Sequence, residues 1–292
     1  MSGTGATGGR PEILRLRRID EHRYAVPNAG QAELRDVVFG GQLLAQVIVA
    51  AADRHPGKNV RSVQAIFARA ARVSEAVEIA ADPMHAGRAF ASETFTVWQG
   101  DRLCARMLVL LDADEPDVVR HAAPAPDVDG PEEAVPQGQG GLVFPGAELR
   151  IVGGVDTWAV DAPVAPAELF LWMRGPGSPG ERCVDQAVVA FATDGFLIGT
   201  AMRPHAGIGQ DEAHRSLSTG VIAHTLVFHE PFDTGEWLLF AHHSPYAGGG
   251  RSFGEASVYT RDGRLVASFV QTNMIRHFAE PGSAEGQYRT VM

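Results

Sequence analysis

Residues 39–53 read FGGQLLAQVIVAAAD, and almost every residue after Gly40 and Gly41 is apolar. Leu, Gln and Ala favour the α-helix, and a helix that is apolar on nearly all sides has to be surrounded by protein. A helix of this length extends about 20 Å, which is too short to span a bilayer. About four strands at a spacing of about 4.8 Å would cover it. The stretch therefore predicts a buried helix wrapped by a curled antiparallel sheet.

Strand patterns follow this helix and then return later in the chain. A first strand is expected within residues 12–26, and further strands at 62–69, 76–85, 89–99 and 103–111. Residues 112–142 are rich in Asp, Glu, Pro and Gly, so they are expected to form a linker without a core. After the linker, the sequence predicts a second apolar helix at 184–202 and strands at 149–152, 169–174, 221–228, 237–244, 254–260 and 265–273.

The two halves repeat the same short motifs in the same order. GRAFA at 87–91 precedes RLCA at 102–105, and GRSFG at 250–254 precedes RLVA at 264–267. The first pair of motifs is offset by 163 residues and the second by 162. Such a repeat is typical of a duplicated structural unit. We therefore predict an α+β double hotdog, with an N-terminal unit at 12–112, a linker at 113–146 and a C-terminal unit at 147–280. The two sheets should join edge to edge, with both helices on one side.

Composition excludes several functional classes. The 292 residues carry a formal net charge of −10, which argues against nucleic acid or an anionic membrane as the main partner. Cys104 and Cys183 are isolated, and the first residues lack an apolar signal core. A cytoplasmic protein without a membrane span is expected. No histidine or cysteine motif has metal-ligand spacing, so neither a metal nor a cofactor is predicted. No Gly-x-Ser-x-Gly motif is present, which disfavours a serine nucleophile.

Several stretches resemble the type II acyl-CoA thioesterases, the group of bacterial thioesterase II and the peroxisomal acyl-CoA thioesterases. The resemblance covers residues 12–277 apart from the linker. It implies a double-hotdog enzyme that hydrolyses fatty acyl-CoA to free fatty acid and CoA, and that forms a homo-oligomer. The matching stretches are VFGGQ at 38–42, GRAF at 87–90, LR at 149–150, FATD at 191–194, HTLVFHEPF at 224–232, EWLL at 236–239, GRSF at 250–253 and LVASFVQ at 265–271.

Asp194 and Gln271 are the leading candidates for catalysis. Asp194 lies in VVAFATDGFLIG, where a bare carboxylate is costly unless it is hydrogen-bonded or solvated, and such positions are enriched in functional sites. Asp194 and Gly195 could instead simply end or kink a helix. The resemblance implies that Asp194 is the catalytic carboxylate. It also implies that Gln271 and a Ser or Thr hydroxyl help to hold the water that attacks the thioester.

The Ser or Thr hydroxyl that the resemblance implies is absent from its aligned position. The family's Ser or Thr aligns with Val221, and the family's neighbouring Asp aligns with Ala223. Thr219 would share a strand face with Val221, so a bulge or register shift could bring Thr219, or else Ser218, to the water. Either the site is rebuilt in this way or it is weaker than in its relatives. A weakened site would leave an acyl-CoA-binding or regulatory protein.

The remaining candidates concern substrate binding. Gly40 and Gly41 would let a backbone approach closely, and Gln42 could donate to a ligand, although packing at a helix N-terminus also accounts for it. Arg88 and Arg251, in the repeated turns, could meet the phosphates of CoA or simply face water. A hotdog hydratase or dehydratase is a further alternative. It would need a His–Asp pair in a helix region, and neither predicted helix contains a histidine.

Overall fold

The computed structural model describes residues 10–28, 36–137, 143–178, 180–213 and 215–278. The first half has a short helix η1 (Glu12–Leu14), the helix α1 (Gly40–Arg54) and the strands β1 (Arg17–Arg18), β2 (Arg23–Val26), β3 (Asn59–Phe67), β4 (Val77–Ala86), β5 (Phe90–Gln99) and β6 (Arg102–Asp112). The helices of the second half are η2 (Val152–Gly154), α2 (Arg182–Thr193), α3 (Leu197–Met202) and η3 (Gln210–Glu212). Its strands are β7 (Val135–Pro136), β8 (Glu148–Ile151), β9 (Glu168–Arg174), β10 (Leu217–Phe228), β11 (Leu238–Gly248), β12 (Arg251–Thr260) and β13 (Leu265–His277).

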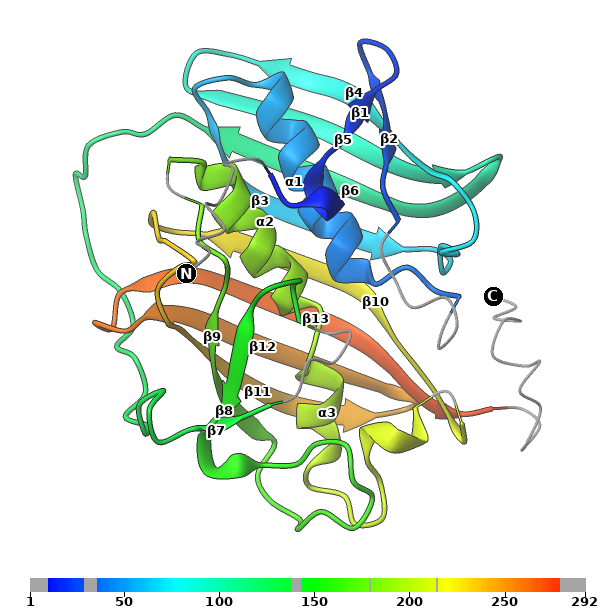
Figure 1. The fold of residues 1–292 in the computed structure, drawn as a ribbon, viewed down its shortest axis with the longest axis vertical. Coiled ribbons are helices and arrows are strands. Elements are labelled where there is room, and N and C mark those ends of the chain that lie inside the picture. Colours follow the sequence, from blue (N-terminus) through cyan, green and yellow to red (C-terminus); the bar gives the residue numbers. More distant parts are fainter. Residues whose placement is uncertain (1–9, 29–35, 138–142, 179, 214, 279–292) are drawn as a thin grey trace, which may run out of the picture.

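One sheet runs through both halves (Figure 1). Within the described residues its strand order is β1-β2-β4-β5-β6-β3-β10-β13-β12-β11-β9-β8-β7. The halves meet where β3 pairs with β10 in antiparallel register, from Ser62 opposite Val227 to Ile66 opposite Ala223. The predicted α+β double hotdog, with its sheets joined edge to edge, is therefore confirmed.

The helix predicted at 39–53 is confirmed as α1. Leu44, Val47 and Ile48 are completely buried there, and burial of each such side chain contributes about 1.5–3 kcal/mol. The helices α1 and α2 lie side by side against the same face of the sheet (Figure 1). This contact brings the start of α1, from the first half, to the end of α2, from the second half.

The prediction of one continuous helix at 184–202 is wrong. The chain leaves the helix after Thr193 and resumes it at Leu197. Phe196 adopts a left-handed backbone with φ 70°, which costs a residue with a side chain about 1–3 kcal/mol. Asp194 therefore lies at a helix end rather than inside a helix. The stretch Arg182–Met202 is long and apolar enough to cross a membrane, but 89% of its apolar 18-residue window is buried inside the fold, as expected for a core segment.

The structure also differs from the prediction of a single strand within residues 12–26. This segment forms η1 and then the two short strands β1 and β2. The carboxylate of Asp20 accepts hydrogen bonds from the His22 amide at 2.9 Å and from Arg23 Nε at 2.7 Å. These bonds close a turn in the middle of the segment, since Asp side chains stabilise turns by bonding to the backbone two residues on.

The segment after β6 packs more closely than its polar composition predicted. Ala134 and Phe144 are buried, and Ala125 packs with a second apolar cluster around Trp172 and Trp237. Trp172 Nε1 donates to a backbone carbonyl of the segment, that of Asp129, at 2.9 Å. The few apolar residues of this region meet aromatic side chains supplied by distant strands, so the region packs against the second half of the fold. The predicted division at 113–146 stays a prediction.

Candidate active site

Asp194 lies at the end of α2 and is only 9% exposed. Its Oδ2 accepts a hydrogen bond from the backbone N–H of Gly41, the second residue of α1, at 3.0 Å. Its Oδ1 has no hydrogen-bond partner among the described residues. Burial raises the pKa of Asp194 from 3.8 to about 7, and the Gly41 hydrogen bond partly opposes this shift. A carboxylate that titrates near neutral pH is well matched to general-base catalysis.

Glycine is required where α1 meets α2. A Cβ at Gly41 would lie 2.2 Å from the carbonyl oxygen of Phe191, and a Cβ at Gly40 would lie 2.6 Å from Asp194 Oδ2. The missing side chains let the start of α1 approach the carboxylate directly. The partial positive charge of a helix N-terminus favours a negative group at this point. The structure thus places Gly40 and Gly41 beside Asp194.

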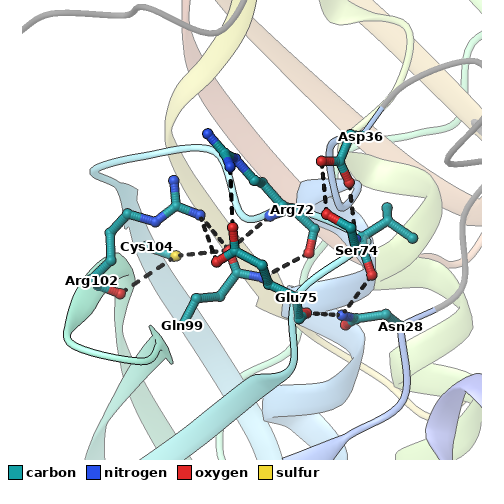
Figure 2. A network of polar contacts seen from close by, with 9 residues as sticks. Asn28, Asp36, Arg72, Ser74, Glu75, Gln99, Arg102 and Cys104 are labelled. Carbon is teal, nitrogen blue, oxygen red and sulfur yellow. Dashed lines mark hydrogen bonds and ion pairs between the residues drawn. The ribbon is translucent and has the colours of Figure 1, made fainter.

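A polar network fixes the chain that leads into α1 (Figure 2). The Asp36 carboxylate accepts hydrogen bonds from the amide and the hydroxyl of Ser74, at 2.9 and 2.8 Å, and Asn28 Nδ2 donates to the Glu75 carbonyl at 2.6 Å. Gln99 Nε2 in turn donates to the carbonyls of Arg72 and Glu75. Residues 28 and 36 are therefore held by the loop between β3 and β4, and this anchoring positions the start of α1.

The side-chain amide of Gln271 has a fixed orientation. Gln271 lies on β13 and is 1% exposed. Its Nε2 donates to the carbonyl oxygen of Thr193 at 2.7 Å and lies 2.9 Å from His224 Nδ1. Because a carbonyl oxygen can only accept, the nitrogen of the amide must face Thr193. The Oε1 atom has no partner among the described residues, so Gln271 offers an acceptor to the site.

His224 is a third buried polar side chain beside Asp194 and Gln271, and the sequence analysis did not select it as a functional residue. Thr193 Oγ1 donates to the Ala190 carbonyl, so it accepts from His224 Nε2, 3.1 Å away. His224 Nδ1 is then the acceptor that faces Gln271 Nε2. Burial lowers the pKa of His224 to about 3, so a neutral imidazole lies 3.8 Å from Asp194 Oδ1. A signal was available in the sequence, since His224 alternates with the apolar residues Leu226 and Phe228 on β10.

Thr219 does not join this group. The register of β10 and β13 shifts between Val221, opposite Asn273, and Ala223, opposite Thr272. The sequence analysis considered a bulge or register shift of this kind as a way to bring Thr219 to the water. Thr219, however, pairs with Ile275, four residues beyond Gln271 and therefore about 13 Å along the strand. The catalytic role that the sequence analysis assigned to Thr219 is a hypothesis that the Thr219→Val variant tests.

Within the described residues, no hydrogen bond joins the side chains of the remaining binding candidates to Asp194 or Gln271. Gln42 is buried and its Nε2 donates to the Pro27 carbonyl at 3.1 Å, which agrees with the packing interpretation. Arg88 is exposed in the turn before β5. Arg251 is also exposed, and in the strand register it lies opposite Met274 of β13. Because side chains alternate along a strand, Gln271 and Asn273 lie on the other face of β13 from Met274. Contact of these arginines with CoA phosphates stays a prediction.

The fold and the site define a class of double-hotdog proteins, and comparison with known proteins identifies the family. A solved structure of this kind, the acyl-CoA thioesterase II TesB2 of Mycobacterium marinum, superimposes with a TM-score of 0.75 at 24% identity, over 92% of this chain and 98% of that chain. The model of the acyl-CoA thioesterase C-terminal domain matches residues 119–275, and that of the N-terminal domain matches residues 29–111. The chain therefore belongs to the acyl-CoA thioesterase family, whose members are thioester hydrolases.

Two curated relatives match along most of their length. Acyl-coenzyme A thioesterase 8 of Mus musculus is 25% identical over 293 residues, which cover 90% of this chain and 88% of the relative. Acyl-CoA thioesterase 2 of Haemophilus influenzae is 24% identical over 285 residues, which cover 90% of this chain and 96% of the relative. The similarity thus spans both halves of the sheet rather than one hotdog unit.

Proposed function

We propose that the chain hydrolyses fatty acyl-CoA to free fatty acid and CoA, through a water molecule held by Asp194 and Gln271. The observation that carries this proposal is the pair of buried acceptors, Asp194 Oδ1 and Gln271 Oε1, that no described residue satisfies. A water molecule has two O–H groups to donate to them, and its lone pairs then remain for attack on a carbonyl carbon. The names of the mouse and Haemophilus influenzae relatives support acyl-CoA as the substrate.

The proposed reaction needs no covalent enzyme intermediate. The water oxygen bonds to the thioester carbonyl carbon while one water proton passes to Asp194 Oδ1. The positive end of the α1 dipole favours the negative charge that develops nearby. Collapse of the tetrahedral intermediate breaks the carbon–sulfur bond, and the CoA thiolate takes the proton from Asp194. Gln271 fixes the direction of the water, because its own amide is fixed by Thr193 and His224.

A thiol-release assay over acyl-CoAs of graded chain length tests this function. We expect free thiol and fatty acid to appear in equal amounts. At saturating substrate the rate should rise as the pH increases through about 7, because Asp194 must be deprotonated to act as the base. Tight binding of acyl-CoA without release of thiol would contradict the proposal and support the alternative, an acyl-CoA-binding or regulatory protein.

We place this activity in the cytoplasm, in fatty acid and lipid metabolism. Cys104 and Cys183 are both free thiols in the described part of the chain, as is usual in a reducing compartment. Fatty acyl-CoA is the only partner that the proposal requires, and it requires no cofactor. Within the described residues, no three His, Cys, Asp or Glu side chains lie close enough to share a metal ion.

We also propose that two or more copies of the chain associate through the outer face of β3 and β6. Ile66, Leu108 and Leu110 are 57%, 40% and 37% exposed on these paired strands. Exposed apolar groups of this kind are typical of interaction surfaces. Sedimentation at micromolar concentration should give a mass of at least twice the 31.1 kDa of the chain.

Leu108→Glu should shift this mass toward the monomer, because a buried charge without a partner is costly. Val118→Glu is the matched control, since Val118 is 97% exposed and lies outside the sheet. A wild-type protein that sediments near 31 kDa would rule out this association.

A further inference from the structure

Asn273, like Asp194 and Gln271, carries a buried acceptor without a partner among the described residues. It is completely buried, and its Nδ2 donates to Ser252 Oγ at 3.3 Å. Its Oδ1 has no hydrogen-bond partner among the described residues. An unsatisfied buried acceptor costs about 1–3 kcal/mol. The water mechanism proposed above does not use this atom.

The position of Asn273 relates it to the proposed water site. Asn273 follows Gln271 by two residues on β13, so both side chains lie on the same face and their Cα atoms are about 7 Å apart. Asn273 is also directly opposite Val221 on β10. Val221 has no polar group, so it cannot satisfy the Oδ1 atom. On the other side of Gln271, the same face carries the buried ring of Phe269.

The chemistry of an acyl-CoA limits what can satisfy this acceptor. A saturated fatty acyl chain has no N–H or O–H group. The nearest donor to the thioester is the N–H of the amide two carbons beyond the sulfur, in the pantetheine arm. The four bonds from the thioester carbonyl carbon to this nitrogen span a little less than the separation of about 7 Å between the Cα atoms of Gln271 and Asn273.

We propose that Asn273 Oδ1 accepts a hydrogen bond from this thioester-proximal amide N–H and so selects thioesters of pantetheine-type thiols. The inference rests on the proposed function, because it requires a thioester beside Gln271. It assigns the thiol half of the substrate to the Asn273 side of Gln271 and the acyl half to the Phe269 side. Asn273 is thus a binding residue for the thiol group rather than for the fatty acid.

Two small thioesters with the same acyl group isolate this hydrogen bond. One is a thioester of N-acetylcysteamine, which keeps the amide N–H. The other is the corresponding thioester of 2-acetoxyethanethiol, in which an ester oxygen replaces N–H and nothing else changes. We expect the wild-type protein to hydrolyse the amide compound with a kcat/KM about tenfold higher, the factor that corresponds to about 1.4 kcal/mol for one buried hydrogen bond.

Asn273→Leu should abolish this preference, because Leu has nearly the same shape and no acceptor. Its kcat/KM for the ester compound should change much less than its kcat/KM for the amide compound. Ser252→Ala removes the other partner of Asn273 and should keep the preference. Thr272→Val is the matched control, because Thr272 is exposed on the opposite face of β13. Thermal unfolding of each variant checks that it is folded. If Asn273→Leu does not fold, Asn273→Ala is used in its place.

The two proposals fail in different ways. Equal wild-type hydrolysis of the amide and ester compounds would overturn the role of Asn273 and leave the thioesterase function intact. A preference that survives in a folded Asn273 variant would also overturn it. Absence of thiol release from both compounds and from acyl-CoA would overturn the proposed function and this inference with it.

Discussion

Replacing Asp194 with Asn is expected to lower the rate of acyl-CoA hydrolysis by about 10²–10⁴-fold, the usual contribution of general-base catalysis. The substitution is nearly isosteric, and the amide oxygen can still accept the hydrogen bond of the Gly41 N–H. Acyl-CoA affinity should therefore remain while the proton acceptor is lost. Gln271→Ala should lower the rate less, because the base remains and only the orientation of the water is lost.

Thr219→Val is the control for the predicted hydroxyl. Because Thr219 lies about 13 Å from Gln271 along the sheet, we expect Thr219→Val to leave thiol release unchanged. A strong loss of thiol release in Thr219→Val would instead show that the Thr219 hydroxyl takes part in catalysis. Unchanged thiol release in Asp194→Asn would place the general base elsewhere in the molecule.

The same Asp194→Asn substitution should stabilise the protein at alkaline pH. The pKa of Asp194 rises from 3.8 in the unfolded chain to about 7 in the fold. Between these values the native state binds more protons than the unfolded state, so the free energy of unfolding falls as the pH rises through this window. At pH 8 the buried charge costs at most on the order of 4 kcal/mol. Urea unfolding at pH 4 and pH 8 should show a smaller loss of stability in the variant than in the wild type.

Replacing Glu93 with Gln is expected to destabilise the fold by about 3–5 kcal/mol, because it leaves the charge of Arg54 buried without its partner. Glu93 is 1% exposed, and its two carboxylate oxygens lie 2.9 and 2.7 Å from Arg54 Nε. The Arg54 side chain is itself only 9% exposed. Arg54 also donates to the carbonyl of Glu21, so this pair joins the end of α1, β5 and the turn before β2.

Glu132→Gln provides the matched control for Glu93. Glu132 pairs with Arg261 at 2.9 Å, but both side chains are more than half exposed. An exposed ion pair contributes about 1 kcal/mol at most. Urea unfolding should therefore separate the two variants clearly. A similar, small decrease in the free energy of unfolding in both variants would show that the Arg54–Glu93 pair stabilises the fold no more than a surface pair does.

The sequence alone determined the repeated architecture of this protein. The apolar stretch at 39–53 predicts a wrapped helix, because its hydrophobic residues occupy nearly all sides of the helix. The alternating strands and the repeated motifs at 87 and 250 then specify two copies of one unit. The cost of a carboxylate in an apolar stretch singled out Asp194. These conclusions depend on local patterns, which a sequence displays directly.

Only the tertiary structure decided how the candidate site is assembled. Gly41 and Asp194 are 153 residues apart in the chain, and Gln271 and Thr193 are 78 apart. The break at Phe196, the neutral state of His224 and the orientation of the Gln271 amide all follow from such long-range contacts. The shift in register that places Asn273 opposite Val221 is of the same kind. No local pattern encodes these contacts, because each depends on how two distant elements pack.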